Sequence, residues 1–172
     1  MKTVALLIAH QGYQAIEYGV TKDILIKQGL KVLTISNKPG IATAHDSSTT
    51  DVDLPLEKIN LDIIEALFLI GGNGALDCLD NENVYHLLQE VYSLGIPYGS
   101  ICIASRILAK AGVLGGKRAT GWDGDNKLDQ IFQEHAVIYV KKPVVVDGTI
   151  VTATGPQAAQ EFAEEIVTVL RD

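Results

Sequence analysis

The sequence predicts an α/β domain in which helices cover both faces of a mostly parallel sheet. Short apolar runs rich in Val, Ile and Leu alternate with longer segments whose apolar residues recur at helical spacing, as they do in βαβ units. The runs are continuously apolar, which is typical of parallel strands buried on both faces. The chain has 172 residues, and we expect residues 1–172 to form one domain. These observations together indicate a doubly wound, flavodoxin-like sandwich.

The first part of the chain supplies three strands and one helix. Gln14–Gln28 is predicted to be helical because its apolar residues recur every four positions and Gly29 follows as a stop signal. Asn37–Asn60 is polar and turn-rich, so we expect a hairpin-like excursion there. The predicted strands are Thr3–Ile8, Lys31–Ser36 and Ala66–Ile70.

The second part continues the alternation. Asn81–Leu94 is the clearest predicted helix, with its apolar residues on one face. A strand over Pro97–Ile101 runs directly into Cys102, and the helix after it ends at Ala111–Gly112. Pro156 marks the start of the last helix, where its missing N–H costs nothing. The remaining predictions are strands over Arg118–Gly121, Val137–Val140 and Val144–Thr152, the last with a turn at Asp147–Gly148, and a helix over Asp125–Phe132.

Composition and charge limit the partners. The formal net charge of −7 gives an acidic surface that repels phosphate backbones, so we expect no nucleic acid partner. No apolar run approaches the roughly 18 residues that a membrane span needs, so we expect no membrane partner and a cytoplasmic location. The two cysteines and four histidines do not follow zinc-ligand spacing. We therefore expect no metal and no cofactor.

Cys102 stands at the carboxyl end of a predicted strand, the edge where ligands bind in open α/β sheets. In Ser100-Ile101-Cys102-Ile103-Ala104, small residues lie two positions before and two positions after the cysteine, as a sharp strand-to-helix turn requires. A helix beginning behind the sulfur would lower the pKa of the thiol. The alternative is a small core residue, because free cysteines are commonly buried.

Two further features fall at strand ends. Gly71-Gly72-Asn73-Gly74 can expose backbone N–H groups to an oxyanion, although a simple tight turn explains it equally well. Glu17 lies in the first turn of the first predicted helix. A partly buried carboxyl there can stay protonated and exchange its proton with a thiolate or a substrate. The alternative for Glu17 is a solvent-facing carboxylate favoured by the helix dipole.

These motifs, in this order, resemble the DJ-1/PfpI superfamily over nearly the whole chain. Leu69-Ile70-Gly71-Gly72 is similar to the apolar-Gly-Gly strand end of that family, and the run from Leu108 to Thr120 is similar to its helix and strand after the cysteine. Asp147-Gly148 and Thr154-Gly155-Pro156 also fit.

The resemblance implies a reactive Cys102 hydrogen-bonded by a protonated Glu17. It also implies an oxyanion pocket from the backbone of Gly72 and Ile103, next to Gly71. It further implies a homodimer.

The sequence departs from the family where its members carry an imidazole. Ile103 directly follows the cysteine, and Trp122 aligns with a histidine of DJ-1-like members, so a Cys–His hydrolytic pair lacks its usual base. His10 is an accessory candidate, with a surface-facing loop histidine as the alternative, and Trp122 would supply an apolar wall. Cys78 is expected as filler near a helix start, or as a resolving thiol if it approaches Cys102.

Two hypotheses and one plainer alternative follow. In the first, Cys102 and Glu17 act on a small reactive carbonyl substrate in a glyoxalase-like or hydrolase-like reaction. In the second, the protein is a non-enzymatic redox sensor or protective protein in which Cys102 oxidises to the sulfinate. In the third, the chain is a degenerate scaffold with an inert thiol.

Overall fold

The central sheet of the computed structural model, which describes residues 1–171, has the predicted α/β architecture. Its strands are β1 (Thr3–Ile8), β3 (Lys31–Ser36), β6 (Leu54–Pro55), β7 (Ala66–Leu69), β8 (Tyr98–Ile101), β11 (Val144–Asp147) and β12 (Ile150–Ala153). They lie in the order β11-β12-β8-β7-β1-β3-β6, and each neighbouring pair is parallel except β11 and β12. The carboxyl ends of β1, β7 and β8 therefore meet at one edge.

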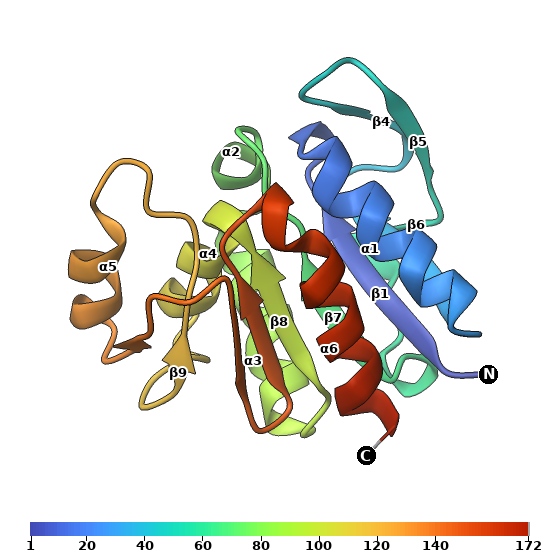
Figure 1. Ribbon diagram of the computed structural model, residues 1–172. Coiled ribbons are helices and arrows are strands. Elements are labelled where there is room, and N and C mark those ends of the chain that lie inside the picture. Colours follow the sequence, from blue (N-terminus) through green and yellow to red (C-terminus); the bar gives the residue numbers. More distant parts are fainter. Residues whose placement is uncertain (172) are drawn as a thin grey trace.

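Helices cover both faces of the sheet. They are α1 (Ala15–Lys27), α2 (Ala75–Leu79), α3 (Glu82–Ser93), α4 (Ser105–Lys110), α5 (Leu128–Glu134) and α6 (Ala159–Arg171). Figure 1 shows α1 and α6 side by side in front of the sheet and α3 behind it. Successive strand residues enter opposite cores: Leu6 and Phe68 pack with α1 and α6, whereas Leu7 and Leu69 pack with α3, α4 and α5.

The polar excursion after β3 contains the expected hairpin. Its strands β4 (Gly40–Ala44) and β5 (Thr49–Val52) are antiparallel, and β4 also pairs with β2 (Gln11–Tyr13), a short strand that the sequence did not predict. The Tyr18 hydroxyl of α1 hydrogen-bonds Thr34 Oγ1 at 2.7 Å and Thr50 Oγ1 at 3.3 Å. These contacts hold the hairpin beside the start of α1.

Two sequence predictions were wrong in their bounds. The strand predicted at Arg118–Gly121 is only β9 (Arg118–Ala119), which pairs with β10 (Ile138–Tyr139) in a separate two-stranded sheet. The helix predicted from Asp125 begins at Leu128, because Asn126 has a φ of 57° and the Leu128 N–H donates to Asp123 Oδ1 at 2.9 Å. The short helix α2 was not predicted.

The remaining sequence predictions hold to within a residue or two. Val144–Thr152 is the β11–β12 hairpin, with Gly148 at a φ of 61° in its turn. Pro156 opens a 3₁₀ turn (η4, Pro156–Ala158) directly before α6. Within residues 1–171, no helix combines the length and the apolar character that crossing a membrane demands. That residues 1–172 form one domain stays a prediction.

Candidate active site at the carboxyl edge of the sheet

Cys102 occupies a sharp turn between β8 and the helical segment that continues into α4. It is the first residue of a 3₁₀ turn (η3, Cys102–Ala104) and has a φ of 64°, a left-handed conformation that costs a side-chain-bearing residue roughly 1–2 kcal/mol. Surrounding contacts hold it there: the Trp122 N–H donates to the Cys102 carbonyl at 3.1 Å, and the Ser100 and Ser105 hydroxyls are hydrogen-bonded at 2.9 Å. The turn predicted from the small neighbours of Cys102 is present.

Glu17 is completely buried and directed at this turn. Gln14 caps α1 by accepting the Glu17 N–H on its side-chain oxygen at 2.8 Å, which fixes Glu17 in the first helical turn. The Gly71 N–H donates to Glu17 Oε2 at 2.9 Å. Oε1 has no nitrogen or oxygen partner among the described residues, and the Cys102 thiol is the side chain that the carboxyl faces.

Glycines make this approach possible. A Cβ on Gly71 would lie 2.7 Å from Cys102 Cβ and 2.9 Å from Glu17 Oε2. A Cβ on Gly72, whose φ is +119°, would lie 2.4 Å from the Gly12 carbonyl oxygen. The two glycines therefore let the end of β7 pass between the carboxyl and the cysteine, which a larger residue would prevent.

The thiol and the carboxyl share one negative charge. Burial raises the pKa of Glu17 to about 7, and burial together with the charge of Glu17 raises the pKa of Cys102 to about 12. The expectation of a lowered thiol pKa was wrong, because desolvation and the neighbouring carboxylate outweigh the backbone N–H groups that face the sulfur. Above pH 7 the pair carries one negative charge, which lies mainly on the carboxyl because the pKa of the thiol is the higher of the two.

Backbone N–H groups of Gly72 and Ile103 face the sulfur and hold the pKa of the thiol below what burial alone would give. They are the two groups that the sequence analysis assigned to an oxyanion pocket. Preorganised N–H donors of this kind favour whichever neighbouring atom carries negative charge.

A cavity of about 350 Å³ opens over the pair. The structure brings together most of the predicted site residues here, namely Cys102, Glu17, Gly72, Ile103 and Trp122, whereas Gly71 lies beneath the pair. His10 does not line the cavity: its Nε2 lies 3.1 Å from the Pro39 carbonyl oxygen, so His10 does not replace the missing imidazole.

Sequence reasoning did not assign four of the cavity-lining residues to the site, namely Gln14, His45, Pro156 and Gln157, and it named a fifth, Asn73, only within the glycine-rich run after β7. His45 comes from the turn of the β4–β5 hairpin, and its Nδ1 accepts the Ala15 N–H at 3.3 Å. No sequence signal placed that hairpin at the site. Pro156 follows the carboxyl end of β12. The rule that ligands bind at the carboxyl ends of strands could have assigned Pro156 to the site.

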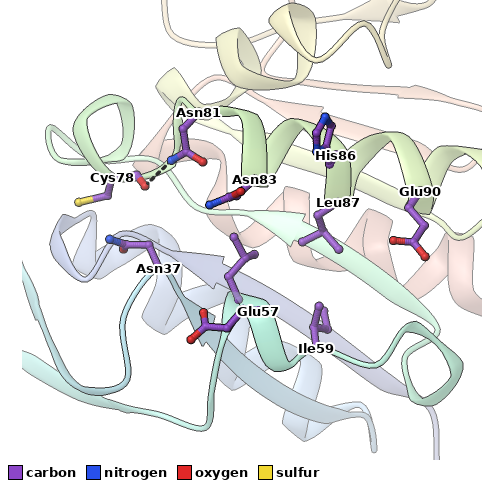
Figure 2. A pocket seen from close by; sticks show the side chains of 10 residues that line it. Asn37, Glu57, Ile59, Cys78, Asn81, Asn83, His86, Leu87 and Glu90 are labelled. Carbon is purple, nitrogen blue, oxygen red and sulfur yellow. Dashed lines mark hydrogen bonds between the residues drawn. The ribbon is translucent and has the colours of Figure 1, made fainter.

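Cys78 belongs to a different and larger cavity, of about 560 Å³, between α3 and the segment around Glu57 (Figure 2). This cavity shares no lining residue with the one at Cys102. The Cys78 thiol contacts the Gln11 carbonyl oxygen at 3.8 Å, and the Cys78 carbonyl accepts a hydrogen bond from the Asn81 side chain at 3.0 Å. We therefore centre the candidate site on the smaller cavity, which holds the thiol–carboxyl pair.

Comparison with known proteins places this chain in one family. The model of the DJ-1/PfpI family matches residues 2–169, so the chain belongs to that family. A Pyrococcus abyssi protein named a deglycase is 33% identical over 166 residues, covering 96% of this chain and 98% of its own. A glutathione-independent glyoxalase of Caenorhabditis elegans is 24% identical over 98% of this chain and 89% of its own. The crystal structure of a ThiJ/PfpI domain protein from Brachyspira murdochii superposes with a TM-score of 0.93 at 25% identity, covering 98% of this chain and 96% of the other.

Proposed function

We propose that this protein converts small reactive carbonyl compounds, in particular 2-oxoaldehydes, into 2-hydroxy acids through Cys102 and Glu17. The observation that carries the proposal is the buried carboxyl that faces a partly exposed thiol in the lining of a cavity. The names of the Pyrococcus deglycase and the Caenorhabditis glyoxalase support carbonyl chemistry in related chains.

The reaction begins when the Cys102 thiol passes its proton to the Glu17 carboxylate and its sulfur attacks the aldehyde carbon. A carbon–sulfur bond forms, the carbonyl π electrons move to oxygen, and the N–H groups of Gly72 and Ile103 stabilise the oxyanion until it takes the proton of Glu17. The Glu17 carboxylate then removes the proton from the former aldehyde carbon and delivers it to the neighbouring carbon, while the hydroxyl proton passes to the neighbouring oxygen, which leaves a thioester. Water finally breaks the carbon–sulfur bond of the thioester. One water is added in total, and the oxidation of one carbon balances the reduction of the other.

The test is the conversion of methylglyoxal to lactate. We expect turnover by the wild-type protein and a loss of at least about a thousandfold in Cys102→Ala. Cys78→Ala is the matched control and should stay within about twofold of wild type, because Cys78 lines another cavity. Folded wild-type protein without turnover at millimolar methylglyoxal would reject the proposal.

Oxidation of Cys102 is the second candidate function. The protonated Glu17 beside the sulfur can donate a hydrogen bond to a sulfinate oxygen, which would select Cys102 over Cys78. Peptide mass spectrometry after treatment with two equivalents of hydrogen peroxide per thiol should then find sulfinate at Cys102 alone. Equal oxidation of both thiols would remove this candidate.

The homodimer and the cytoplasmic location remain predictions. Sedimentation of the full chain tests the first, and microscopy of the protein in its own cells tests the second.

A further inference from the structure

The cavity over Cys102 has an apolar side built from Ile103, Trp122 and Pro156. Its other lining side chains, apart from the reacting pair, are Gln14, His45, Asn73 and Gln157, and no lysine or arginine of the described residues lines it. The reacting pair already holds one negative charge. An anionic substrate would therefore enter an apolar, negatively charged site with no cation to receive it.

Trp122 is held in one position by groups around its ring and backbone. Its backbone N–H donates to the Cys102 carbonyl at 3.1 Å. The Arg106 guanidinium lies 5.4 Å from the indole ring centroid and donates to the Trp122 backbone carbonyl at 3.3 Å. A Cβ on Gly124 would lie 2.5 Å from the ring. The backbone hydrogen bond makes the Trp122 wall part of the same turn that holds Cys102.

Arg106 is the cation that contacts Trp122, and its charge is already paired with Asp125. It forms a two-point ion pair with Asp125, at 2.6 Å to Oδ1 and 3.0 Å to Oδ2, and its side chain is 7% exposed. Its planar guanidinium can bind the carboxylate and stack on the indole at once, which a lysine cannot do. Arg106 therefore orients Trp122 rather than receiving an anion.

Two lysines lie in a neighbouring cavity, and one of them, Lys141, has its Nζ 5.6 Å from the Tyr139 ring centroid. Lys141 and Lys142 line a neighbouring cavity of about 490 Å³ that shares only Trp122 and Gln157 with the cavity over Cys102. Trp122 thus lines both a cavity without lysine or arginine among its described lining residues and a cavity with two lysines.

We propose that the site selects an uncharged 2-oxoaldehyde with an apolar or aromatic substituent packed on Trp122, and that Arg106 is the positioning residue of this wall. This inference rests on the proposed function for the reaction itself. The binding preference follows from the cavity alone, so the two can be tested separately.

The kinetic test compares methylglyoxal, phenylglyoxal and 4-carboxyphenylglyoxal, the last differing from the second by one anionic group. For the wild-type protein we expect kcat/KM for phenylglyoxal to exceed that for methylglyoxal by about tenfold, and the added carboxylate to cancel that gain. Trp122→Ala and Gly124→Ala, the second of which displaces the ring, should each reduce the phenyl-to-methyl ratio about tenfold. Lys141→Ala is the control and should leave the ratio unchanged.

Binding is measured separately from turnover by tryptophan fluorescence. The signal reports on this wall alone, because Trp122 is the single tryptophan of the chain. In Cys102→Ala, 2-hydroxyacetophenone should change the tryptophan fluorescence saturably, and its 4-carboxy derivative should bind at least about tenfold more weakly. Arg106→Lys should weaken binding of the neutral probe and leave the discrimination against the anion.

The outcomes separate the two proposals. Saturable binding of the neutral probe without turnover of any 2-oxoaldehyde would reject the proposed function and leave the binding preference standing. Equal or tighter binding of the carboxylated probe, or an unchanged phenyl-to-methyl ratio in both Trp122→Ala and Gly124→Ala, would overturn the inference.

Discussion

Cys102 and Cys78 are both partly buried thiols that follow the carboxyl end of a central strand, yet their surroundings differ in every respect that matters for chemistry. Cys102 has a left-handed backbone, faces a buried carboxyl and two N–H groups, and lies on the floor of a cavity. Cys78 lies in the ordinary helix α2, with a carbonyl oxygen as the contact of its sulfur. The comparison teaches that a cysteine becomes a candidate nucleophile through the groups that other elements bring to it.

The largest expected effect tests whether the carboxyl is what distinguishes the two thiols. Glu17→Gln keeps the size of the side chain and an oxygen for the Gly71 N–H, but it cannot move a proton. We expect kcat/KM for methylglyoxal to fall by about a thousandfold. Glu161→Gln, at an exposed position of α6, is the matched control. Activity within tenfold of wild type in Glu17→Gln would assign proton transfer to another group.

A second comparison concerns glycines inside and outside the site. Gly72→Ala forces a Cβ against the Gly12 carbonyl in a left-handed conformation, so we expect a loss of at least about 3 kcal/mol in the free energy of unfolding. Gly29→Ala, at a φ of +81° with open space around it, should lose only about 1–2 kcal/mol. Urea denaturation measures both, and equal losses would show that backbone strain, not the close approach, decides the cost.

The pH dependence of stability tests the buried proton. Because burial raises the pKa of Glu17 from 4.5 in the unfolded chain to about 7, the folded state binds this proton more tightly. The resulting stability is complete below pH 4.5 and is lost as the pH rises through 7, by about 3 kcal/mol in total. Urea denaturation of wild type from pH 4.5 to 8 should show this loss, and Glu17→Gln should lack it. Parallel curves for the two proteins would contradict the assignment.

The smallest expected effect is a shift in the pH midpoint of alkylation. Iodoacetamide should label wild-type Cys102 with a midpoint well above that of a free thiol, because burial and the Glu17 carboxylate raise the pKa of Cys102 to about 12. In Glu17→Gln the neighbouring carboxylate is gone, so the pKa of the thiol, and with it the midpoint, should fall toward the value that burial alone sets. Peptide mass spectrometry reads both cysteines, with Cys78 as the internal standard. A midpoint in Glu17→Gln at or above that of wild type would show that the carboxylate does not raise the pKa of the thiol.

The sequence by itself determined the strands and helices whose apolar patterns are strong, such as β1, β3 and α3, because local periodicity fixes which faces are buried. It also located Cys102 and Gly72, because small residues and glycines at strand ends indicate a crowded backbone, and Glu17, because it lies in the first turn of the first predicted helix.

Only the tertiary structure decided the surroundings of these residues. The position of His45 depends on how the β4–β5 hairpin packs against α1, and the position of Trp122 depends on its contact with Arg106, sixteen positions earlier in the chain. The pKa of Cys102 also went against the local expectation, because desolvation and a carboxylate from another helix outweigh the nearby N–H groups. Packing between distant segments determines how deeply a titratable group is buried and which charges lie near it, and the local pattern of residues predicts neither.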